Sequence, residues 1–120
     1  MQREQTEEKS LQMLIGEQLS AVTFVQDYLQ LHFDGPCLTI FSHAVVMLGD
    51  KTFHEGKPGF RDALCNNIAK KVTEARVAYG DSISIRFADG STIKISLKGE
   101  DYAGGEAVNF DTRDSVWWAL

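Results

Sequence analysis

Residues 72–95 read VTEARVAYGDSISIRFADGSTIKI, and apolar side chains recur in them at every second position. Ile83, Ile85 and Phe87 share one side of the run, and the same alternation resumes after Gly90. A period of two is typical of β-strands with one buried face, and a glycine between two such runs favours a tight hairpin. This segment therefore predicts a three-stranded antiparallel meander with one strongly apolar face.

A second segment resembles the first. Residues 19–40, LSAVTFVQDYLQLHFDGPCLTI, align with residues 72–95 when one residue is inserted at each of two turns, which is where insertions cost least. The alignment places Phe33 on Phe87 and Gly35 on Gly90. We interpret the two segments as internal repeats, two diverged copies of one meander.

Two helices are predicted to flank the repeats. The first covers about residues 5–15 and stops at Gly16, and the second begins near Pro58, whose fixed φ suits a first helical turn. Their apolar stripes are Leu11, Leu14 and Ile15 in the first helix, and Phe60, Ala63, Leu64 and Ile68 in the second. We therefore expect one α+β domain, residues 1–120, that is mostly antiparallel β with about six or seven strands. The pattern leaves open whether the meanders join in one sheet or pack as two layers.

The two repeats differ on their second face. In residues 72–95 this face is polar, as on a solvated antiparallel sheet. In residues 19–40 and just beyond, it carries Val25, Tyr28, Cys37, Thr39 and Phe41. Because large exposed apolar patches usually mark contacts, we expect a cover for this face, in the first place one of the two helices. The alternative is a subunit or partner interface.

Composition restricts the function. The chain has 120 residues, a net charge of −5, 43% apolar residues and only two cysteines, which fits a folded cytoplasmic protein with free thiols. An acidic balance argues against nucleic acid or an anionic membrane as partner, and no apolar run approaches the roughly 20 residues of a spanning helix. Phosphate-binding loops, dinucleotide fingerprints and nucleophile elbows are absent from the sequence, which removes several classes of enzyme. We expect no cofactor and favour a non-catalytic role.

A weak candidate polar site contains His43, His54 and Glu55. His54 and Glu55 lie in GDKTFHEGKPG, residues 49–59, which we expect to be a loop. A histidine beside a carboxylate can bind a metal or move a proton, but Pro58 stands where the H-E-x-x-H motif needs its second histidine. His43 would have to be brought close by a hairpin. We prefer an ordinary polar loop and keep a small-ligand or metal-dependent enzyme as an alternative.

His32 and Cys37 flank the turn at Asp34-Gly35 and are expected to face each other across two strands. They have the residue types of a nucleophilic cysteine and its base. The aligned residues of the second repeat are Arg86 and Ser91, so the scaffold does not itself require the pair. We interpret it as a solvent-facing strand pair.

The acidic, loop-like segment 98–120 ends in two adjacent tryptophans, Trp117 and Trp118. If they lie on a strand they point to opposite faces, so only one of them enters the core. Together with Tyr28 and Phe41 they are our candidate interaction residues, since aromatic side chains dominate binding hot spots. The leading hypothesis is a small acidic, non-catalytic protein-binding or regulatory module that neutralises a basic partner. A self-associating structural module, such as a homodimer, is a further alternative.

Overall fold

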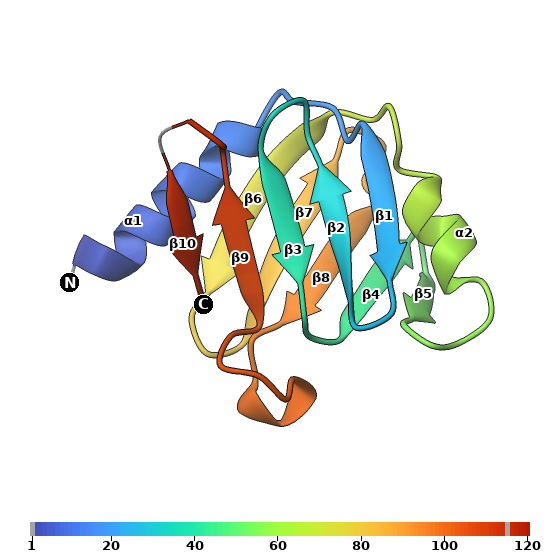
Figure 1. Cartoon of the computed structure of the whole chain (residues 1–120). Coiled ribbons are helices and arrows are strands. Elements are labelled where there is room, and N and C mark those ends of the chain that lie inside the picture. Colours follow the sequence, from blue (N-terminus) through green and yellow to red (C-terminus); the bar gives the residue numbers. More distant parts are fainter. Residues whose placement is uncertain (1, 115) are drawn as a thin grey trace.

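The computed structural model describes residues 2–114 and 116–120, in which ten strands form two five-stranded antiparallel sheets packed face to face (Figure 1). The first sheet contains β1 (Ala21–Val25), β2 (Tyr28–His32), β3 (Cys37–Ile40), β9 (Val108–Asp111) and β10 (Trp117–Ala119), in that spatial order. The second sheet contains β4 (Ala44–Leu48), β5 (Lys51–His54), β6 (Val72–Ala78), β7 (Ser82–Phe87) and β8 (Thr92–Ser96), in the order β5-β4-β8-β7-β6. The predicted α+β, mostly antiparallel class is confirmed, and the meanders belong to two layers.

The helices lie at the sides of the sandwich (Figure 1). α1 (Gln2–Leu11) continues into the 3-10 turn η1 (Gln12–Leu14) and packs along β6, while α2 (Phe60–Cys65) packs beside β4, β5 and β1. A second 3-10 turn, η2 (Gly99–Asp101), lies between β8 and β9. No helix within residues 2–114 and 116–120 has the length and apolar character needed to cross a lipid bilayer.

Two sequence expectations about the elements were wrong. Segment 49–59 is not all loop, because Lys51–His54 forms β5 on the edge of the second sheet. Only Phe53 of β5 is partly buried, so an edge strand of this kind carries little apolar pattern. The expected number of six or seven strands was also too low, because β4, β5, β9 and β10 add to the six strands of the two meanders.

Both helices also end before the last residue of the apolar stripe that was predicted for them. Ile15 and Ile68 are exposed, whereas the other apolar residues assigned to the two stripes are buried. The backbone at Ile15 is already extended and forms a bridge with Val72, and α2 ends at Cys65, one turn before Ile68. The helices therefore stop where the chain must turn back to the sheet.

The two predicted repeats each contain three consecutive antiparallel strands, β1-β2-β3 in one sheet and β6-β7-β8 in the other. Phe33 and Phe87 are both fully buried at the ends of their hairpins. The N–H of Phe33 donates to the carbonyl of Pro36 at 2.8 Å, and the N–H of Phe87 donates to that of Ser91 at 2.9 Å. Descent of the two meanders from one repeated unit remains a prediction.

Candidate functional site

The outer side of the first sheet carries most of the predicted interaction residues. Because side chains alternate along a strand, buried Leu29 and Leu31 leave Tyr28 and Gln30 pointing outward from β2. Strands β9 and β10 alternate in the same way, whereas all four residues of β3 are buried, including Cys37 and Thr39 on its outward side. We call this outward side the aromatic face and define it by Tyr28, Thr39, Phe41, Asn109, Asp111 and Trp117, which line a shallow depression of about 430 Å³.

Aromatic rings lie at two ends of this face. Tyr28 and Phe41 contact each other with ring centroids 5.5 Å apart and a tilt of 54°, an arrangement that aromatic pairs prefer. Trp117 on β10 is 63% exposed. Polar side chains lie between the Tyr28–Phe41 pair and Trp117. Among them, the Gln30 amide of β2 donates a 3.2 Å hydrogen bond to the Thr39 hydroxyl of the neighbouring strand β3. The face thus combines rigid aromatic anchors with hydrogen-bonding side chains.

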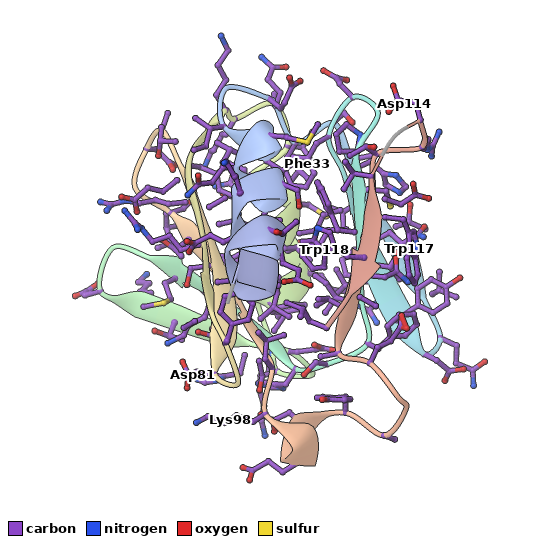
Figure 2. All side chains as sticks on the ribbon, turned by 90° about the vertical axis from the view of Figure 1, so that its left-hand side faces the viewer. Phe33, Asp81, Lys98, Asp114, Trp117 and Trp118 are labelled. Atoms are coloured by element: carbon purple, nitrogen blue, oxygen red, sulfur yellow. The ribbon has the colours of Figure 1, made fainter. Side chains whose placement is uncertain are left out.

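The two tryptophans leave β10 on opposite sides, as Figure 2 shows. Trp118 is only 8% exposed, its ring lies 5.3 Å from that of Phe110, and its Nε1–H donates to the Ser10 hydroxyl of α1 at 2.6 Å. The expectation that only one tryptophan enters the core is confirmed. Trp118 is consequently a core residue, and Trp117 is the tryptophan that belongs to the aromatic face.

Acidic side chains lie on and beside β9, at one side of the aromatic face. Glu106 accepts a 3.2 Å hydrogen bond from the Asn109 amide, and Asp111 accepts one of 2.6 Å from the backbone N–H of Arg113. Asp114 lies in the turn between β9 and β10. Among the described residues 106–114, these three carboxylates outnumber the guanidinium of Arg113, so this side of the face carries net negative charge, which favours cationic groups.

The outer side of the second sheet has the opposite character. Arg76, Arg86 and Lys94 are exposed on it, and Glu74 is its single carboxylate within strands β6, β7 and β8. Ser84 lies between Arg76 and Lys94 in the register of the sheet. The prediction of a polar second face for residues 72–95 is confirmed. The protein's negative charge is therefore unevenly distributed, with cations on one sheet and carboxylates beside the other.

Neither helix covers the aromatic face, so the expected helical cover was wrong. Seen from the side, α1 stands between the two sheets (Figure 2). Leu11 and Leu14 are fully buried there, and the Glu8 carboxylate accepts a 2.9 Å hydrogen bond from the N–H of Val77 on the edge strand β6. The helices bury more apolar surface by closing the open sides of the sandwich than by lying on a half-polar sheet.

His32 and Cys37 face each other directly across β2 and β3, as expected. Cys37 is buried rather than solvent-facing, and burial raises the pKa of its thiol. The His32 ring makes a 3.0 Å hydrogen bond with the Thr23 hydroxyl. Because the thiolate is the reactive form of cysteine, these surroundings do not favour a nucleophile.

The weak polar site is only partly assembled. The β4–β5 hairpin brings His43 and His54 together, with stacked rings whose centroids lie 5.9 Å apart. Glu55 instead lines an opening beside α2, where its carboxylate accepts a 3.0 Å hydrogen bond from the N–H of Ala44. In the described part of the chain, no group of three or more His, Cys, Asp or Glu side chains is placed to hold a metal ion.

Sequence reasoning did not identify the contribution of β9 to the aromatic face. Asn109 and Asp111 lie beside Thr39 and Cys37 because β9 pairs with β3, about 70 positions away in the chain. The alternation in Val108-Asn109-Phe110-Asp111 does indicate that Asn109 and Asp111 share an outward face. It contains no signal for which strand lies next to it.

Comparisons with known protein families, with curated proteins and with solved structures found no match. Function must therefore be inferred from the surfaces of the chain itself.

Proposed function

We propose that this protein is a non-catalytic binding module whose aromatic face docks a basic protein partner. The observation that carries the proposal is the set of Tyr28, Phe41 and Trp117 on one side of the first sheet, where Tyr28 and Phe41 are half-buried and Trp117 is 63% exposed. Tryptophan and tyrosine are enriched among the residues that dominate binding energy. A side chain as large as Trp117 gains most from burial when a partner supplies the cover.

Charge supports the choice of partner. Glu106, Asp111 and Asp114 lie on and beside β9, at one side of the aromatic face, and the net charge of the chain is −5. Complementary charge accelerates encounter and orients the partner, and like charges disfavour the wrong surface. The cations Arg76, Arg86 and Lys94 on the second sheet would repel the same partner, so it would approach the first sheet.

The shape of the surface also favours a protein partner. The depression on the aromatic face has a volume within the range of small-molecule sites, but it lies across the open outer side of the strands, whereas small molecules are usually enclosed by concave pockets. Hydrogen-bonding groups such as Gln30, Thr39 and Asn109 lie between the aromatic ends, which resembles the mixture found in protein interfaces. The proposal places the protein in the cytoplasm, where free thiols such as Cys37 and Cys65 stay reduced.

The experiment is a comparative capture followed by titration. Immobilised wild-type protein and the Trp117→Ala variant are exposed to the same cell extract, and proteins retained only by the wild type are purified and titrated by calorimetry. We expect a partner of basic isoelectric point whose affinity falls by at least about tenfold in Trp117→Ala, the effect of losing a hot-spot side chain. Raising the ionic strength should weaken the complex further, because salt screens exposed charges.

Met47→Ser is the matched control. Met47 is an exposed apolar residue on the outer side of the second sheet, so its loss should leave binding unchanged. A partner that is acidic, or one that Met47→Ser removes as effectively as Trp117→Ala, would contradict the proposal. Sedimentation of the wild type and of Phe41→Ser tests the competing account, since a concentration-dependent dimer that Phe41→Ser abolishes would show that a second copy covers the face.

A further inference from the structure

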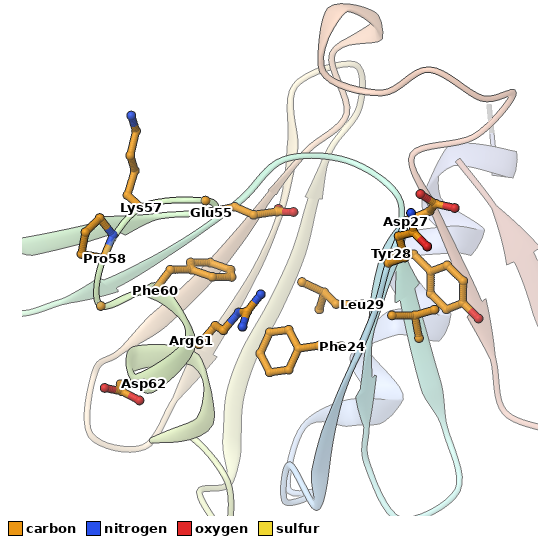
Figure 3. A pocket seen from close by; sticks show the side chains of 14 residues that line it. Phe24, Asp27, Tyr28, Leu29, Glu55, Lys57, Pro58, Phe60, Arg61 and Asp62 are labelled. Carbon is orange, nitrogen blue, oxygen red and sulfur yellow. The ribbon is translucent and has the colours of Figure 1, made fainter.

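A cavity of about 520 Å³ opens at the side of the sandwich next to α2 (Figure 3). It lies between the β1–β2 turn and the loop that connects β5 to α2. Its volume falls within the range of roughly 300 to 1,000 Å³ that is usual for small-molecule sites. We call it the side cavity; it is distinct from the aromatic face, and the ring of Tyr28, which borders both, points away from it (Figure 3).

The inner wall of the side cavity is apolar. Phe60 and Leu29 are buried at its base, and Phe24 stands beside them with 40% of its surface exposed. Phe24 is on the inward side of β1, since it pairs with buried Leu29. At this side of the sandwich the chain leaves the ring partly uncovered, so an apolar ligand group would gain free energy by covering it.

Two opposite charges point into the same space. The guanidinium of Arg61 lies over the Phe24 ring, 5.4 Å from its centre, and the carboxylate of Glu55 extends from the facing loop (Figure 3). No ion pair joins these two described side chains. Three other charged residues line the cavity, Asp27 in the β1–β2 turn and Lys57 and Asp62 on the side of α2, and their charged ends point outward (Figure 3). The cavity therefore presents one cation and one anion that do not neutralise each other.

The acidic group of the cavity is held in place before any ligand arrives. One oxygen of Glu55 accepts the 3.0 Å hydrogen bond from the N–H of Ala44, which leaves its other oxygen for a ligand. The loop that carries Glu55 is exposed, but its end is fixed against the sheet at Gly59, where a Cβ would lie 3.0 Å from the ring of Phe53. Small-molecule sites are usually preformed in this way.

We propose that the side cavity binds a small zwitterion with an apolar body, the chemical class of a free apolar amino acid. The ammonium group pairs with Glu55, the carboxylate pairs with the planar guanidinium of Arg61, and the apolar side chain covers Phe24 and Leu29. A purely cationic ligand would leave Arg61 without a partner, and a purely anionic one would leave Glu55 without one. Only a ligand with both charges uses both groups.

The test is to titrate the full chain with L-leucine and with L-phenylalanine and to monitor binding by two-dimensional NMR. N-acetyl-L-leucine, which lacks the ammonium group, and L-leucinamide, which lacks the carboxylate, are the comparison ligands. We expect saturable shifts around Phe24, Glu55 and Arg61 with the amino acids, and at least about tenfold weaker binding of each blocked compound, the loss of one charge-assisted hydrogen bond. If the shifts do not saturate by roughly 10 mM amino acid, the binding free energy is weaker than about −3 kcal/mol. That result would overturn the proposal.

Two variants separate the charges. Glu55→Gln should weaken L-leucine binding about tenfold and should not weaken the anion N-acetyl-L-leucine, whereas Arg61→Gln should weaken L-leucine and should not weaken the cation L-leucinamide. Lys57→Gln on the rim is the matched control and should alter no affinity. Equal loss for all ligands in one variant, in a protein whose spectrum remains folded, contradicts the assignment. Trp117→Ala should leave amino-acid binding intact, so this proposal and the protein-docking proposal can fail independently.

Discussion

Replacing Trp118 by Ala should strongly destabilise the protein, whereas the same change at neighbouring Trp117 should not. Trp118 is 8% exposed, packs on Phe110 and donates to Ser10 across the gap between β10 and α1. Truncation of a buried aromatic side chain to Ala typically costs about 3 to 5 kcal/mol, and the loss of the hydrogen bond adds about 1 kcal/mol. This is a large share of the roughly 5 to 15 kcal/mol that stabilises a domain.

Urea unfolding followed by far-ultraviolet circular dichroism measures the effect without relying on tryptophan fluorescence. Trp118→Ala should lower the midpoint with little change in the slope, because the fold and the surface exposed on unfolding stay the same. Trp117→Ala should stay within about 0.5 kcal/mol of the wild type, as is usual for exposed positions. Trp118→Phe, which keeps a ring but removes the N–H donor, should be intermediate.

Equal destabilisation by Trp117→Ala and Trp118→Ala would refute the placement of β10, since it would mean that both rings are buried. A cost of Trp117→Ala that grows with protein concentration would instead reveal self-association through the aromatic face. Fluorescence provides an independent measurement. Trp118 alone, in Trp117→Phe, should emit at shorter wavelength and resist quenching by acrylamide, whereas Trp117 alone, in Trp118→Phe, should be quenched readily.

Three further predictions concern the core, an ion pair and a loop. Phe87→Ala should lower the free energy of unfolding by about 3 to 5 kcal/mol in urea titrations, because the ring is fully buried; a loss below about 1 kcal/mol would contradict this burial. The hydrogen bond from Lys70 lowers the pKa of Asp89 from 3.8 to about 2. The ionised Asp89 therefore stabilises the folded state above about pH 4, and this contribution disappears as the pH falls toward 2 and the carboxylate is protonated. Because the Lys70–Asp89 pair is partly exposed, Asp89→Asn should be at most about 1 kcal/mol less stable than the wild type at pH 6. The two proteins should become equally stable near pH 2. A difference in stability that does not depend on pH would argue against the ion pair. Gly59→Ala should lower the melting temperature, because φ is +89° at this residue and the new methyl group would press on the Phe53 ring. Gly90→Ala is the control, since Gly90 has a similar φ but open space around it. It should lower the melting temperature less, by the amount that the backbone conformation alone contributes.

Local sequence patterns determined which side of each regular strand is buried. The alternation around Ile83, Ile85 and Phe87 gave the correct inward face of β7, and the adjacency of Trp117 and Trp118 required that only one enter the core. The hairpin turns were also predictable. These features depend on residues a few positions apart, where the two-residue period of a strand and the turn preference of glycine apply directly.

Only the tertiary structure decided which strands are neighbours and where the helices pack. β3 pairs with β9 through Leu38 and Phe110, and β4 pairs with β8 through Val46 and Ile93, although neither pair is adjacent in the chain. The period of a strand specifies its faces, but every strand edge offers the same backbone donors and acceptors, so the sequence pattern does not select the neighbour.

The two candidate sites depend on those long-range choices. The aromatic face places Trp117 on the same sheet as Tyr28 and Phe41 because β9 and β10 return to the first sheet, and the side cavity exists because α2 brings Arg61 over Phe24. From the sequence alone, each of these residues could be recognised as aromatic or charged and, at best, assigned to an element. Their grouping into sites follows from packing two sheets around one core, in which the total burial of apolar surface, and no local preference, determines which segments meet.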